Sequence, residues 1–184
     1  MSLTLPPPGV AVFLMVMVLT AAVYDVRFRR IPNWITVSGV VIGLGLNTFL
    51  YRGLPGLVFS LKGLALGFGL YFLLYALHAM GAGDVKMMAA VGALVGWEDW
   101  FAIFVLTALL GGILAGLVML LRGRVKKTIW NLGYILGEMK HGRAAYLTRE
   151  ELDVKSPKSV GLPHGAVIAV GTMFFLAISA HFVK

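Results

Sequence analysis

A run of uncharged residues near the start of the chain limits what the chain can fold into. Residues 2–24 contain no charged side chain, and Gly9 to Tyr24 is apolar apart from Thr20. A helix needs about 20 apolar residues to cross the hydrocarbon core of a bilayer, and this run supplies them. Because the basic segment that begins a secretory signal peptide is missing, we interpret the run as a transmembrane helix.

The composition extends this interpretation to the whole chain. Of the 184 residues, 59% are hydrophobic and 13% are charged, whereas soluble domains have about 45–50% and about 25%. Five further apolar runs are present, of which the third is short, at about 34–51, 57–80, 85–95, 100–121 and 163–183. The predicted fold is therefore all-α, a single integral-membrane domain over residues 1–184 built as a bundle of about six transmembrane helices.

The positions of the basic residues predict the orientation of this bundle. Nine of the 16 lysines and arginines fall between Arg122 and Lys158. Positive charge gathers on the cytoplasmic side of membrane proteins, so we expect a basic cytoplasmic loop at about 122–162 and an N-terminus outside. This topology places 13 basic residues inside and three outside. The expected partner for the charge is an anionic lipid surface, and no nucleic-acid-binding motif accompanies it.

Other patterns predict features of packing and of the loop. Pairs of glycines four residues apart indicate close contacts between helices in lipid, at Gly39 and Gly43, Gly63 and Gly67, and Gly112 and Gly116. Within the basic loop, Ile129, Leu132, Leu136 and Met139 share one helical face. That pattern suits a short helix on the membrane surface, with a solvated linker as the alternative.

Two carboxylates stand apart from the other acidic residues. Six of the eight, Asp99 among them, are expected in loops where water is available, whereas Asp25 and Asp84 lie at the ends of apolar runs. At 1.5 Å per residue, Gly9 to Asp25 spans roughly 24 Å and Asp84 to Glu98 roughly 21 Å. The hydrocarbon core is about 30 Å thick. We therefore expect both carboxylates at similar depths, slightly inside the cytoplasmic face.

Two neighbouring carboxylates cannot both ionise easily, so they share a proton. The ionised member can then take a proton from water while the protonated member polarises a peptide carbonyl, with no metal or cofactor. The helix dipole favours Asp84, which opens a helix, as the base and Asp25, which ends one, as the acid.

Other interpretations of the two carboxylates stay open. Asp84 alone also suits a helix N-cap, and Asp25 alone suits an ion pair with a neighbouring arginine. Together, the two suit a proton relay in a transporter or channel, although we find neither the internal repeats nor the helices broken at the membrane midplane that are common in transporters.

Residues beside the two carboxylates are candidates for shaping the site. Gly81 and Gly83 would let an extended substrate backbone approach Asp84 without obstruction by side chains. Lys86 and Arg27 are placed to tune the carboxylates, although both also fit the positive charge expected at the cytoplasmic side. Asn33 follows a proline and is interpreted as a helix cap. The four histidines show no ligand spacing, and the chain has no cysteine, so no metal site is predicted.

These residues resemble the bacterial type IV prepilin peptidases, which are intramembrane aspartic proteases of the GxGD class. The similar elements are Asp25-Val26-Arg27, Ile31-Pro32-Asn33, Gly81-Ala82-Gly83-Asp84-Val85-Lys86 and, less distinctively, Leu162-Pro163-His164-Gly165. The resemblance implies that Asp25 and Asp84 are the catalytic pair. It also implies a prepilin substrate, with a basic leader and an apolar helix, cut at the cytoplasmic face of the bacterial inner membrane.

Two other comparisons refine this resemblance. Presenilin-type GxGD proteases place their aspartates on consecutive spans, whereas here they fall on the first and fourth. Longer members of the prepilin peptidase family carry a cytoplasmic region with cysteines that is linked to N-methylation of the product. This chain has neither the region nor a cysteine, so it resembles the short, peptidase-only branch associated with Tad/Flp-type pili. The oligomeric state and the particular prepilin are left open.

Overall fold

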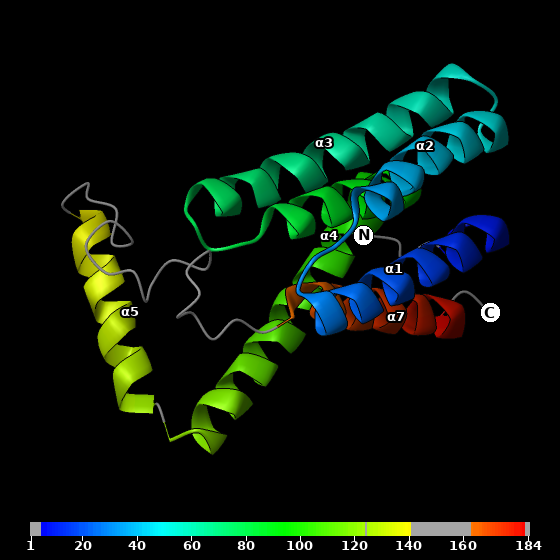
Figure 1. Ribbon diagram of the computed structural model, residues 1–184. Helices are drawn as coiled ribbons and strands as arrows, with labels where there is room; N and C mark the ends of the chain where they lie inside the picture. The colour runs from blue at the N-terminus through cyan, green and yellow to red at the C-terminus, as the bar shows by residue number, and fades with distance from the viewer. Residues whose placement is uncertain (1–4, 124, 141–162, 183–184) are drawn as a thin grey trace.

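The computed structural model describes residues 5–123, 125–140 and 163–182, and this part of the chain is helical with no strand. Five of its helices are long and apolar enough to cross a membrane. The helices, labelled as in Figure 1, are α1 (Pro8–Phe28), α2 (Asn33–Leu50), α3 (Leu54–Ala76), α4 (Ala82–Leu121), α5 (Val125–Lys140) and α7 (His164–Phe182). The expected all-α membrane bundle is therefore confirmed.

Helix α4 contains two of the six expected spans. Its 40 residues would form a straight helix of about 60 Å, twice the thickness of a hydrocarbon core. The helix is broken at Gly96, whose φ of 76° and ψ of −177° lie in a region open essentially to glycine alone. Figure 1 shows two parts of α4 running in different directions. The first half is the short fourth span, and the second half is the fifth.

The first half of α4 is the centre of the bundle. Nearly every residue from Asp84 to Gly96 is buried, and Lys86 is the exception. Helices α2 and α3 pack against this half, while α7 packs against both α1 and α4 (Figure 1). A helix surrounded on all sides has no polar face, which explains why its sequence is continuously apolar.

Glycines allow the closest contacts with this central helix. A Cβ added to Gly63 of α3 would collide with the backbone of Gly92 in α4, and one added to Gly43 of α2 would lie 2.9 Å from the backbone of Ala93. The predicted packing role is therefore confirmed at these positions. No such contact is found at Gly112 and Gly116, where an added Cβ would meet nothing within 4 Å among the residues that the structure describes.

The bend in α4 also changes the interpretation of Asp99. We expected Asp99 in a loop with access to water, but it lies within α4 and is 6% exposed. It falls in the first turn after the break, where unsatisfied backbone N–H groups stabilise a negative charge. The next residue, Trp100, donates a hydrogen bond from Nε1 to the carbonyl oxygen of Met88 at 2.9 Å. This bond joins the two halves of α4 across the bend.

The predicted helix in the basic loop is present as α5, and its Ile129 and Trp130 side chains are largely exposed. The rest of the predicted loop, residues 141–162, lies outside the described residues.

Candidate functional site

Asp84 lies in the first turn of α4. Helix α3 ends at Ala76 and α4 begins at Ala82, so the Gly81–Asp84 motif forms the start of a helix. The backbone N–H of Gly81 donates a hydrogen bond to Oδ2 of Asp84 at 3.2 Å, and Asp84 is only 9% exposed. Asp84 therefore stabilises the helix start as the third residue of α4, whereas the N-cap position itself belongs to Gly81.

Asp25 lies in the last turn of α1 and is also 9% exposed. Its Oδ2 accepts a hydrogen bond of 2.8 Å from the backbone N–H of Gly165, in the first turn of α7. Each carboxylate is thus held by a backbone N–H at the start of a helix. The helix dipole consequently does not distinguish the two, because the unfavourable end of α1 is offset by the favourable start of α7.

Gly165 is a site residue that the sequence interpretation did not single out. A Cβ added to it would lie 3.0 Å from Oδ2 of Asp25 and 3.0 Å from Cδ1 of Ile31. The contact joins residues 140 positions apart, so local patterns do not reveal it. The signal available was the Leu162–Gly165 segment, in which a proline precedes a glycine at the start of an apolar run.

The two carboxylates line a single open pocket of about 560 Å³. The residues that surround it come from the end of α1, the connection to α2 and the start of α4. They are Asp25, Arg29, Arg30, Ile31, Pro32, Asn33, Gly81, Ala82, Gly83, Asp84 and Lys86. The pocket therefore combines two buried acids, three basic side chains at its rim and room for an extended peptide.

The connection between α1 and α2 forms one wall of this pocket. Helix α1 ends where Arg29 adopts a left-handed conformation, with φ of 53°, and its N–H donates to the carbonyl oxygen of Asp25 at 2.9 Å. The chain then passes Gly83, where an added Cβ would lie 3.2 Å from Cβ of Ile31. Gly83 thus has a structural role, because it lets this connection approach the start of α4.

The remaining predicted site residues are divided by the structure. Lys86 donates a hydrogen bond from Nζ to Oδ1 of Asn33 at 2.9 Å, and both residues line the pocket. The predicted capping role of Asn33 is wrong, because Pro32 occupies the N-cap position of α2 and Asn33 is the first residue of the helix. Arg27 does not line it, and its guanidinium lies 5.7 Å from the centre of the Phe28 ring. Arg29 and Arg30, which were not among the predicted site residues, line the pocket instead.

A buried aromatic side chain supports the start of α7. The hydroxyl of Tyr71 is hydrogen-bonded to Nε2 of His164 at 3.4 Å, and Tyr71 is 1% exposed. His164 directly precedes Gly165, so this contact fixes the segment that holds Asp25.

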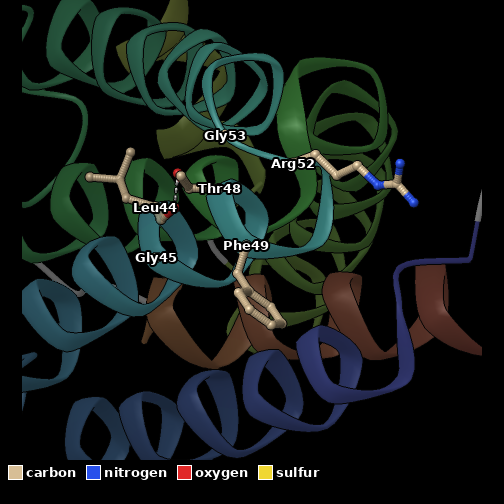
Figure 2. A pocket seen from close by; sticks show the side chains of 6 residues that line it. All are labelled: Leu44, Gly45, Thr48, Phe49, Arg52 and Gly53. Atoms are coloured by element: carbon tan, nitrogen blue, oxygen red, sulfur yellow. Dashed lines mark hydrogen bonds between the residues drawn. The ribbon is translucent and has the colours of Figure 1, made fainter.

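A larger pocket, of about 630 Å³, lies at the other end of α2. Figure 2 shows its lining: Leu44, Gly45, Thr48, Phe49, Arg52 and Gly53. The Thr48 hydroxyl donates to the carbonyl oxygen of Leu44 at 2.6 Å and is therefore occupied within the helix. Because its lining contains no acid or other general base, this pocket is a poorer candidate for catalysis despite its size.

Comparisons with known proteins agree with the resemblance. Residues 12–116 match the model of the type IV leader peptidase family. The chain is 34% identical over 137 residues to the prepilin leader peptidase/N-methyltransferase of Escherichia coli K12, covering 64% of this chain and 60% of that protein. It is 32% identical over 80 residues to the preflagellin peptidase of Methanocaldococcus jannaschii, covering 42% of this chain and 34% of that protein. No solved structure matches it significantly.

Proposed function

The chain belongs to the type IV leader peptidase family, and we propose that it is an intramembrane aspartic endopeptidase that removes the basic leader from type IV prepilins. The observation that carries the proposal is the pairing of Asp25 and Asp84. They come from different helices, both are nearly buried, and both line one open pocket at the end of the bundle. Intramembrane carboxylates are costly and are retained where they have a function.

The proposed chemistry uses the two carboxylates in different protonation states. The ionised carboxylate accepts a proton from a water molecule as the water oxygen attacks the carbonyl carbon of the scissile bond. The protonated carboxylic acid donates a hydrogen bond to the carbonyl oxygen, which becomes the second hydroxyl of a tetrahedral intermediate. The carboxyl group that accepted the water proton then transfers it to the amide nitrogen. The other carboxylate takes a proton back from one hydroxyl as the C–N bond breaks. Because Asp25 and Asp84 each accept a backbone N–H, either can carry the negative charge.

We place the site at the cytoplasmic face of the bacterial inner membrane, with the N-terminus outside. The support is the distribution of positive charge: Arg29, Arg30 and Lys86 line the pocket, and basic residues mark the cytoplasmic side of membrane proteins. The basic leader of a prepilin, which also remains in the cytoplasm, would then reach the carboxylates directly. The lipid bilayer and the prepilin are the two partners in this proposal.

We further propose that the enzyme is a peptidase without methyltransferase activity and acts on Tad/Flp-type prepilins. The chain spans about three fifths of the length of the E. coli protein named as both peptidase and N-methyltransferase. Only four residues separate α1 from α2, three separate α2 from α3 and five separate α3 from α4. None of these three connections is long enough to hold a folded cytoplasmic region, and the sequence contains no cysteine.

The test is co-expression with a Tad/Flp-type prepilin, followed by electrophoretic mobility to detect loss of the leader. Asp25→Asn and Asp84→Asn keep the shape of each side chain and remove its acid, so each should abolish cleavage while the protein still inserts. Glu98→Gln is the matched control, since Glu98 is an exposed carboxylate on α4 that does not line the pocket.

Cleavage that survives either aspartate substitution would refute the dyad. Proton flux into vesicles that depends on both aspartates, without proteolysis, would favour a transporter or channel instead. Mass spectrometry of the product tests the narrower proposal, since an N-methylated product would contradict a peptidase-only enzyme.

A further inference from the structure

An apolar groove adjoins the pocket that holds the two carboxylates. It has a volume of about 380 Å³ and runs between α2 and α3, with α4 beneath it, and we call it the α2–α3 groove. Its lining residues are Asn33, Thr36, Val37, Val40, Val41, Leu64, Phe68, Lys86 and Ala89. Asn33 and Lys86 line both the groove and the carboxylate pocket, so the two spaces are adjacent and share this pair of residues.

The groove has projecting sides and a shallow floor. Val37, Val41 and Phe68 are 58%, 61% and 46% exposed, so they stand out from the surface of the bundle. The floor contains Thr36 and Ala89, which are 3% and 5% exposed. The Thr36 hydroxyl donates to the carbonyl oxygen of Asn33 at 3.1 Å, so it presents no free polar group. Small floor residues between larger walls allow a second helix to approach closely.

The groove and the carboxylate pocket meet at the Lys86–Asn33 hydrogen bond of 2.9 Å. From Asn33, the lining of α2 extends eight residues to Val41, roughly 12 Å along the helix axis. That length corresponds to about two turns of a helix lying in the groove, with its end at the Lys86–Asn33 pair. Beyond this pair the space changes from apolar to charged.

We propose that the α2–α3 groove binds the first turns of the apolar helix that follows the cleavage site in the substrate. The peptide bond just before that helix would then lie beyond Lys86 and Asn33, over Asp25 and Asp84. This inference rests on the proposed function, because it requires a substrate with a leader followed by an apolar helix. Lipid tails are as apolar as such a helix, so the helix is favoured by packing against the groove and by the position of the groove beside the carboxylate pocket.

Cross-linking tests the position of the substrate helix. The chain has no cysteine, so a single introduced cysteine can be labelled with a benzophenone maleimide without background. Val41→Cys is made together with Asp84→Asn, which retains the substrate uncut. Val16→Cys is the matched control: Val16 is 57% exposed on α1 and lines neither space. It lies nine residues from Asp25, roughly 14 Å, and so at a depth similar to that of Val41.

The full-length prepilin should cross-link from Val41→Cys at several times the yield obtained from Val16→Cys. A kinetic variant gives a second readout. Val41→Trp should raise KM for the prepilin about tenfold by overfilling the groove, with kcat within about twofold of wild type. Val16→Trp should change neither constant.

The outcomes separate this inference from the function on which it rests. Equal cross-linking yields from the two positions, or adducts with lipid alone from Val41→Cys, would overturn the groove as the helix site, as would an unchanged KM in Val41→Trp. In those cases wild-type cleavage that depends on both aspartates would leave the peptidase intact. If wild-type protein does not cleave the prepilin, the proposed function fails and the groove assignment fails with it.

Discussion

Replacing Gly165 with alanine adds one methyl group directly against the Asp25 carboxylate. The new Cβ would lie 3.0 Å from Oδ2 of Asp25, 3.1 Å from its Cβ and 3.0 Å from Cδ1 of Ile31. Contacts between carbon atoms are favourable at about 3.5–4.0 Å, so the carboxylate or the helix must shift by roughly half an ångström. Such a shift lengthens the 2.8 Å hydrogen bond from the Gly165 N–H to Asp25. Valine adds two further carbons and should break this bond.

A hydrogen bond to a charged group contributes about 1.5–3 kcal/mol. If Asp25 needs this bond to work, its loss lowers kcat/KM by roughly ten- to a hundredfold, since each 1.36 kcal/mol is a factor of ten. We expect Gly165→Ala near the lower figure and Gly165→Val near the higher one. Thermal stability in detergent should stay close to wild type for Gly165→Ala, because alanine favours a helix over glycine by about 0.5–1 kcal/mol and offsets the tighter contact.

The assay is the initial rate of prepilin cleavage by purified protein in detergent, measured beside the thermal unfolding temperature. Gly69→Ala serves as the control, since Gly69 is a helical glycine of α3 where an added Cβ meets nothing within 4 Å. A wild-type kcat/KM in Gly165→Val would refute the reasoning, because the hydrogen bond from Gly165 of α7 to Asp25 would then not contribute to catalysis.

Three further substitutions test the bundle and the rim of the pocket. Gly63→Ala forces a Cβ into the backbone of α4, and such overpacking should lower the free energy of unfolding by about 1–3 kcal/mol. The unfolding temperature should therefore fall in Gly63→Ala and stay unchanged in the control Gly69→Ala. Asn47→Leu removes the hydrogen bonds that buried Nδ2 donates to carbonyl oxygens of α4 at 3.0 and 3.1 Å, and should cost about 1–2 kcal/mol in the same measurement. Lys86→Met keeps the length of the side chain but removes its hydrogen bond to Asn33. Since this contact is exposed, we expect kcat/KM to fall by no more than about fivefold. Complete loss of cleavage would show that Lys86 is directly required for the reaction.

Much of this protein could be predicted from local patterns along the chain. Hydropathy and charge act on each segment separately, so the uncharged runs specify helices that cross the bilayer whatever their neighbours are. The same argument isolates Asp25 and Asp84, because a carboxylate at the end of an apolar run is recognisable without knowing what lies beside it. The rise per residue then places both at one depth, and the structure brings them to one pocket.

Other features depend on contacts between distant segments, and only the tertiary structure decides them. The backbone N–H of Gly165 donates a hydrogen bond to Asp25, which lies 140 positions away in the sequence. A backbone donor cannot be identified from the sequence. Gly96 looked like any other glycine of an apolar run, yet its backbone bends α4 and buries Asp99. Arg29 and Arg30, which follow the last turn of α1, line the pocket, whereas Arg27 within α1 does not. Sequence specifies which segments enter the membrane, whereas packing decides which groups meet there, since the same apolar surface can pack against many neighbours.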